Sequence, residues 1–172
     1  KDIKFLKSAI KEFGSANISV LIESIKIKNE YYISYLNGRE LVNINPINWS
    51  KKIEDTGAGE IVLTSVNKEG LMNGFDNYLA DKIQKKIKIP VIVHGGAGSF
   101  KDIFNVLNLK NVHGVMIAGM LHYHYLNFTS LSCKKEIGNT EFLKNFEKRN
   151  IKKNYIKNLK KYLKIKNINI RL

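Results

Sequence analysis

A glycine-rich stretch carries the residue types best suited to hold an anion. Residues 91–98 read Val-Ile-Val-His-Gly-Gly-Ala-Gly, and Ser99 then opens an amphipathic segment. This order predicts a buried strand, a tight turn and the start of a helix. Backbone N–H groups at such a turn, aided by the helix dipole, form a ready anion site, although many similar turns bind nothing. A phosphate ester is the anion that we expect at this turn, which contains Gly95 and Gly96.

Several other side chains could take part in chemistry, but each could also have a purely structural role. His94 could transfer protons or contact a phosphate, but packing at the end of a strand explains its position equally well, and we assign it no catalytic role. Asp76 follows glycines and is interpreted first as a loop or helix cap and second as a substrate contact. His122, His124 and Cys133 could form a metal cluster, yet they lack a second ligand motif, so no metal is predicted.

These residues must be positioned by alternating strands and helices. Helical apolar spacing is found at Ile3–Phe13, from Pro46 to Gly57, at Asn77–Lys86 and from Ser99 to Leu107. Apolar strand segments are found at Ile18–Glu23, Glu60–Ser65, from Val91 and at Gly114–Ala118. Asn37-Gly38 predicts a two-residue hairpin turn between strands at Tyr31–Leu36 and Arg39–Asn43.

The last third of the chain has a weaker pattern. No clear period is recognisable from His122 to Gly138. Two closing helices are predicted near Thr140–Lys148 and Ile151–Lys164, followed by a short extension at Ile168–Leu172.

Four successive strand–helix units predict an α/β fold with parallel strands and right-handed crossovers. Four units alone fit either an open doubly wound sheet or half of an eight-stranded barrel. Polar or glycine-rich residues follow every strand, and barrel enzymes place their sites on the loops after strands, with a phosphate held after the last two. This loop chemistry favours the C-terminal half of a (βα)8 TIM barrel, forming a single domain over residues 1–172.

Composition restricts the environment and the partners of the chain. Its 172 residues are 44% hydrophobic, which suits one globular domain, and no apolar run is long enough to cross a membrane. Cys133 has no possible disulfide partner, which favours a cytoplasmic setting. The formal net charge of +14 comes almost entirely from scattered lysines, which we interpret as solvated helix faces rather than a nucleic-acid surface.

A series of motifs also occurs in a recognisable order. They are Gly57 to Ser65 (Gly-Ala-Gly-Glu-Ile-Val-Leu-Thr-Ser), Gly70, Gly74-Phe75-Asp76, Pro90 to Gly98, Ile117 to Tyr123 and Leu163 to Arg171. Together they resemble the cyclase subunit of imidazole glycerol phosphate synthase. The resemblance covers nearly the whole chain but only the second half of that family's barrel, whose first four βα units have no counterpart in these residues.

The resemblance implies a lyase that takes ammonia from a partner glutaminase and needs no cofactor. Ammonia would react with a bis-phosphorylated ribulosyl-carboxamide substrate, giving imidazole glycerol phosphate and an aminoimidazole carboxamide ribotide in histidine biosynthesis. Thr64 would lie beside the substrate, and Glu60 would belong to a charged gate for ammonia or to an ordinary salt bridge. The substrate phosphate would be held by Glu69, Gly70, Gly95, Gly96, Ala118 and Gly119.

Departures from that family surround the expected reacting centre. Of the family's two catalytic aspartates, one lies outside this chain and the other matches Glu23, a carboxylate one methylene longer. A proton donor must lie within about 3 Å of its target, and a displacement of about 1 Å can cost about a hundredfold in rate. Asn67, Glu69 and Leu71 also differ from the family pattern, and His94 replaces a serine.

These departures leave alternatives open. One is a paralogue that uses ammonia to aminate or amidate a sugar in surface polysaccharide or flagellin glycan synthesis, which the long link at His124–Asn150 also favours. Another is a non-catalytic half-barrel that binds a phosphorylated ligand. Because half a barrel exposes two strand edges and an inner face, we expect residues 1–172 alone to be inactive and to dimerise or aggregate.

Overall fold

The computed structural model of the chain describes residues 2–128 and 156–171. The chain forms two compact units, Lys1–Ile117 and Ala118–Leu172. The prediction of one domain over residues 1–172 stays a prediction.

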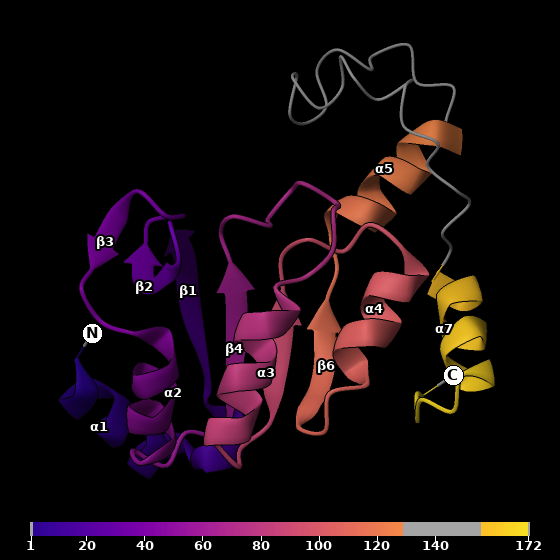
Figure 1. The fold of residues 1–172 in the computed structure, drawn as a ribbon. Helices are drawn as coiled ribbons and strands as arrows, with labels where there is room; N and C mark the ends of the chain where they lie inside the picture. The colour runs from indigo at the N-terminus through magenta and orange to yellow at the C-terminus, as the bar shows by residue number, and fades with distance from the viewer. Residues whose placement is uncertain (1, 129–155, 172) are drawn as a thin grey trace. The chain divides into compact units, whose positions relative to one another are not determined.

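The first unit is built on a six-stranded sheet with the order β3-β2-β1-β4-β5-β6. Its strands are β1 (Ser19–Ile27), β2 (Glu30–Tyr35), β3 (Glu40–Val42), β4 (Glu60–Ser65), β5 (Val91–His94) and β6 (Val112–Met116). Strands β1, β4, β5 and β6 are parallel, so their carboxyl ends meet at one edge of the sheet (Figure 1). The predicted parallel α/β fold is confirmed as a partial TIM barrel whose sheet is not closed.

Three helices of the first unit cover one face of this sheet, namely α2 (Pro46–Glu54), α3 (Asn77–Lys86) and α4 (Phe100–Leu107). The unit also contains helix α1 (Ile3–Phe13) and a short 3-10 helix η1 (Ser15–Asn17). Helices α2, α3 and α4 lie in front of the strands in Figure 1, against the face that buries Ile22, Ile61 and Val93. The opposite face, called here the inner face, leaves Leu21 58% and Met116 49% exposed. Apolar exposure on this scale suits the expected self-association, which stays a prediction.

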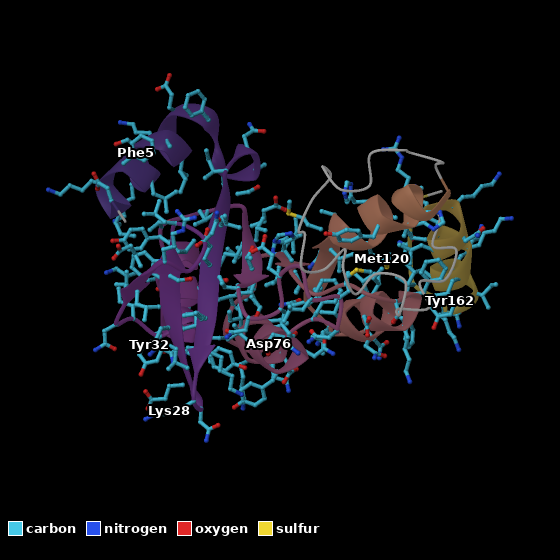
Figure 2. All side chains as sticks on the ribbon, turned by 90° about the horizontal axis from the view of Figure 1, so that it is seen from above. Phe5, Lys28, Tyr32, Asp76, Met120 and Tyr162 are labelled. Atoms are coloured by element: carbon cyan, nitrogen blue, oxygen red, sulfur yellow. The ribbon has the colours of Figure 1, made fainter. Side chains whose placement is uncertain are left out.

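Helix α1 is bounded as the sequence predicts. The Asp2 carboxylate accepts hydrogen bonds from the amides of Lys4 (2.9 Å) and Phe5 (3.2 Å), and Gly14 ends the helix. Its apolar residues are not buried, however, and Phe5, labelled in Figure 2, is 72% exposed.

The hairpin region corrects the sequence prediction in two ways. Strand β1 runs on to Ile27 and pairs antiparallel with β2, whereas the predicted strand stops at Glu23. The β2–β3 turn contains four residues rather than two, because Leu36, Asn37 and Gly38 all adopt positive φ and Tyr35 pairs with Glu40. The predicted strand ends at the polar pair Glu23-Ser24, although Ile25, Lys26 and Ile27 continue the alternation that is typical of a strand.

Two further boundaries differ from the prediction. Strand β6 spans Val112–Met116 instead of Gly114–Ala118, since it begins where the Val91 amide bonds to Asn111 O and Val112 pairs with Val91. In the second unit, helix α5 (Gly119–Phe128) covers part of the segment for which no period was recognised.

The second unit also contains helix α7 (Ile156–Ile165), the described part of the predicted closing helix, and it buries Leu159 and Leu163. The helix predicted near Thr140–Lys148 lies outside the described residues.

Candidate active site

A row of side chains crosses the inner face near the carboxyl ends of the parallel strands. Glu23 on β1 pairs in register with Thr64 on β4, which in turn pairs with His94 on β5. On the other side of Glu23 the register partner is Ser34 on β2, and the row ends at Met116 on β6. Residues in register on neighbouring strands point to the same face of a sheet, so Ser34, Glu23, Thr64 and His94 form a continuous polar row that the apolar Met116 ends.

Thr64 holds the imidazole of His94. The Thr64 Oγ1 lies 3.1 Å from Nδ1 of His94, and Thr64 is only 4% exposed. A hydrogen bond at Nδ1 fixes the orientation of the ring and leaves Nε2 as the nitrogen available for proton transfer.

Glu23 carries a buried carboxylate oxygen. Its Oε2 is shielded from solvent and has no hydrogen-bond partner among residues 2–128 and 156–171. A buried polar atom without a partner is costly, and such atoms concentrate where a protein binds a ligand or performs chemistry. The sheet therefore presents an unsatisfied acceptor beside the Thr64–His94 pair.

The loop after β5 begins with two glycines that no other residue could replace without strain. Gly95 and Gly96 have φ of 88° and 111°. A Cβ on Gly96 would overlap the carbonyl oxygen of Gly74, and a Cβ on Gly98 would overlap that of Met72. The loop after β4 is thus packed directly against the loop after β5, and a hydrogen bond of 2.8 Å from Gly74 N to Gly96 O joins them.

This packing brings part of the predicted phosphate site together. The Gly95 Cα faces the backbone of the β4 loop, where the position of a Cβ would lie 3.5 Å from Glu69 N. Gly95 and Gly96 are buried, and their amides donate to no described residue in the recorded hydrogen bonds. The N-cap of α4 follows at Ser99, whose hydroxyl accepts from the Asp102 amide at 3.2 Å. Free amides next to a helix N-terminus suit an anion.

The remaining predicted site residues are Gly70, which is exposed, and two residues of the second unit. Gly70 has φ of 73°, is exposed, and a Cβ there would meet no described atom within 4 Å. Ala118 and Gly119 begin the second unit, where Ala118 O accepts from the amides of Leu121 and His122. Their assignment to the phosphate site stays a prediction.

Glu60 lies at the opposite, amino end of β4, as predicted. It accepts a hydrogen bond from the Ser19 hydroxyl. The ion pairs recorded among the described residues do not include Glu60, so its role at an ammonia entrance stays a prediction.

Asp76 is confirmed as a helix cap. Its Oδ1 accepts from the Leu79 amide at 3.0 Å, and its carboxylate also accepts from the Tyr31 hydroxyl at 3.1 and 3.0 Å. Burial and this hydrogen bond raise the pKa of Tyr31. The contact fastens the β1–β2 hairpin to α3, where Tyr31 stacks on Tyr78 with ring centroids 6.1 Å apart.

In the described part of the chain, no three His, Cys, Asp or Glu side chains are grouped to hold a metal ion. His122 and His124 lie on α5, and Cys133 lies outside the described residues. Every described helix falls short of the length and apolar character that a membrane span requires.

His94 is the residue whose place in the site the sequence analysis missed. Its neighbour Thr64 is 30 residues earlier in the chain, so only strand register brings the two side chains together. No local sequence signal marks this contact, because the register that pairs Thr64 with His94 is set only when the strands pair.

The comparisons with known proteins agree on one family. A family model described as "Histidine biosynthesis protein" matches residues 1–127. "Imidazole glycerol phosphate synthase subunit HisF" of Prochlorococcus marinus (strain MIT 9515) is 38% identical over 125 residues, covering 71% of this chain and 49% of that protein. The subunit of the same name from Sulfolobus acidocaldarius is 37% identical over 138 residues, covering 80% of this chain and 53% of that protein.

A further relative of that name, from Hydrogenobaculum sp. (strain Y04AAS1), is 33% identical over 132 residues, or 76% of this chain and 52% of the relative. The chain therefore spans about half the length of the curated relatives it matches.

Proposed function

Because this chain belongs to the histidine biosynthesis protein family, we propose that it provides one half of the active site of an ammonia-dependent cyclase. The reaction would join ammonia to a bis-phosphorylated ribulosyl-carboxamide and release imidazole glycerol phosphate and an aminoimidazole carboxamide ribotide. A glutaminase subunit would supply the ammonia. The names of the relatives favour this lyase function over the alternative in glycan synthesis.

One observation carries the proposal. Glu23 Oε2 and the amides of Gly95 and Gly96 have no hydrogen-bond partner in the part of the chain that the structure describes. They lie at the same edge of the sheet, on elements joined by the register of β1, β4 and β5. A proton-transfer group next to an anion site suits a phosphorylated substrate that undergoes ring closure.

Each predicted residue then takes a distinct role. Glu23 would transfer protons at the reacting carbon, and Thr64 would border the substrate. Glu60 would lie at the entrance through which ammonia reaches the inner face from the amino edge. The phosphate would be bound by Glu69, Gly70, Gly95, Gly96, Ala118 and Gly119.

The setting of this reaction follows from the proposal. A biosynthetic enzyme with a small phosphorylated substrate and a glutaminase partner would act in the cytoplasm. Nucleic acid and membrane take no part in it, and no cofactor is needed.

The test uses the chain together with the portion of the S. acidocaldarius relative that it does not match, supplied in trans. We expect ammonia and the ribulosyl substrate to give the imidazole product. Glu23→Gln should lower turnover by at least about a hundredfold, because the amide cannot accept the proton. Glu40→Gln, on the exposed strand β3, serves as the matched control and should keep full activity.

Two results would contradict the proposal. One is the absence of turnover by the wild-type assembly, with phosphate binding retained, which would favour a non-catalytic binding module. The other is unchanged turnover in Glu23→Gln.

A further inference from the structure

We propose that His94 is a second proton-transfer group of this site and works with Glu23 from the opposite side of Thr64. The inference rests on the proposed cyclase function and deepens it.

The geometry places the two groups on either side of one strand. Glu23 lies on β1 and His94 on β5, and both are in register with Thr64 on β4. Neighbouring strands lie about 4.8 Å apart, so the two Cα atoms are separated by roughly 10 Å on the same face. That spacing leaves room for a reacting carbon and its substituents between a carboxylate and an imidazole.

The two side chains are prepared in different ways. Glu23 has a buried oxygen without a partner in the described part of the chain, so it is ready to accept a proton. His94 is half-buried and held through Nδ1 by the Thr64 hydroxyl at 3.1 Å, which leaves Nε2 to exchange a proton. An oriented imidazole paired with a carboxylate is a common acid–base arrangement in enzymes.

Few other charged groups face His94. On the loop after β4 the candidates are Lys68 and Glu69, since this loop packs on Gly95 and Gly96. On β6 the register partner of His94 is Met116, which carries no charge. Glu23 is therefore the one carboxylate that shares the row with His94 among the described strands.

Condensation of ammonia with a ketone carbonyl requires two such groups. In the addition step a nitrogen–carbon bond forms, Glu23 takes one proton from nitrogen, and the His94 imidazolium gives one to the carbonyl oxygen. In the second step the carbon–oxygen bond breaks and water leaves with a proton from Glu23, while neutral His94 takes a proton from nitrogen. The sum is C=O plus NH₃ giving C=NH plus H₂O, with both residues restored.

The experiment uses the assembly described above, with ammonia and the ribulosyl substrate. We expect His94→Asn to lower turnover by about a hundredfold or more, while thermal unfolding and phosphate binding stay as in the wild type. His94→Ala should recover at least about tenfold when millimolar imidazole is added, because the free base can replace the missing proton donor. Glu23→Gln should show no such recovery.

The pH profile separates proton transfer from a structural role. At saturating ammonia, the pH profile of turnover should differ in shape between the wild type and His94→Asn, because the variant lacks one proton-transfer group. Thr64→Val removes the hydrogen bond to the ring and should lower turnover while keeping the pH dependence. His113→Asn is the control, because His113 is exposed and bonds to Asn111 O at the other end of the sheet.

The outcomes distinguish the two proposals. A wild-type assembly without turnover overturns the cyclase function and this inference together. Turnover in the wild type with more than half retained by His94→Asn, or a loss that imidazole does not restore in His94→Ala, overturns the role of His94 alone.

Discussion

The two edges of the parallel sheet are built differently. At the amino edge, backbone groups of neighbouring segments bond to one another, as in Gly59 N to Ile18 O (3.1 Å), Ile61 N to Pro90 O (3.0 Å) and Val91 N to Asn111 O (3.3 Å). At the carboxyl edge, backbone groups also join the loops, as in Gly74 N to Gly96 O (2.8 Å), but Glu23 Oε2 has no partner among the described residues. The amino edge thus supports the stability of the sheet and the carboxyl edge supports activity, a division that is also typical of barrel enzymes.

Side chains reinforce the amino edge. Asn111 donates through Nδ2 to Ile87 O (3.1 Å) and Gln84 O (3.4 Å), and its amide donates to Gln84 Oε1 (3.1 Å). Glu54 accepts from the amides of Lys88 (2.5 Å) and Ile89 (3.2 Å), which lead into β5.

The largest effect is expected at Glu23, where a substitution should lower turnover without lowering the free energy of unfolding. Glu23→Gln should abolish most turnover, by about a hundredfold or more, because it removes the proton acceptor. The same change should leave the free energy of unfolding unchanged or raise it, because Glu23 Oε2 has no hydrogen bond to lose among the described residues. Urea unfolding measured beside the activity assay checks both. A clear loss of stability would show that the Glu23 carboxylate is a structural group.

Next in size are two glycine substitutions on the facing loops. Gly96→Ala should lower the free energy of unfolding by about 2–4 kcal/mol and weaken phosphate binding, because the methyl group meets Gly74 O at a positive φ. Gly70→Ala is the matched control, with a positive φ and open space in the described structure, and should cost only about 1 kcal/mol. Equal losses in the two variants would contradict the close packing of the loops.

A moderate effect is expected at the amino edge. Asn111→Ala removes the two hydrogen bonds that Nδ2 donates to Ile87 O and Gln84 O, and should lower the free energy of unfolding by about 1–2 kcal/mol. Phosphate affinity, measured by calorimetry, should not change. A simultaneous loss of phosphate affinity would contradict the view that the amino edge supports stability and the carboxyl edge supports activity.

The smallest effect is a pH dependence at Glu54. Burial alone would raise the pKa of Glu54, but hydrogen bonds from Lys51 Nζ and from the amides of Lys88 and Ile89 outweigh it and lower that pKa. The stabilisation is therefore complete above the ordinary pKa of a glutamate and is lost as pH falls through the lowered value. Because Lys51 is exposed, we expect less than about 1 kcal/mol. Glu54→Gln should flatten this part of the stability–pH curve.

Local sequence patterns predicted the strands and helices that carry the site better than they predicted which of its side chains are in contact. The apolar run at Glu60–Ser65 and the capped helix at Asn77–Lys86 have the predicted bounds, since their signals lie within a few residues. The Thr64–His94 contact depends on strand register, and the Tyr31–Asp76 contact depends on how far β1 extends beyond Glu23. Both are set by tertiary pairing, which neither composition nor spacing contains.

The interlocking of Gly96 with Gly74 O and of Gly98 with Met72 O has a mechanical consequence. Neither loop can move over the sheet without the other, so the loops after β4 and β5 behave as one rigid element rather than as a mobile lid. Substrate would be selected by its fit to a preformed site, and no binding energy would be needed to close a lid.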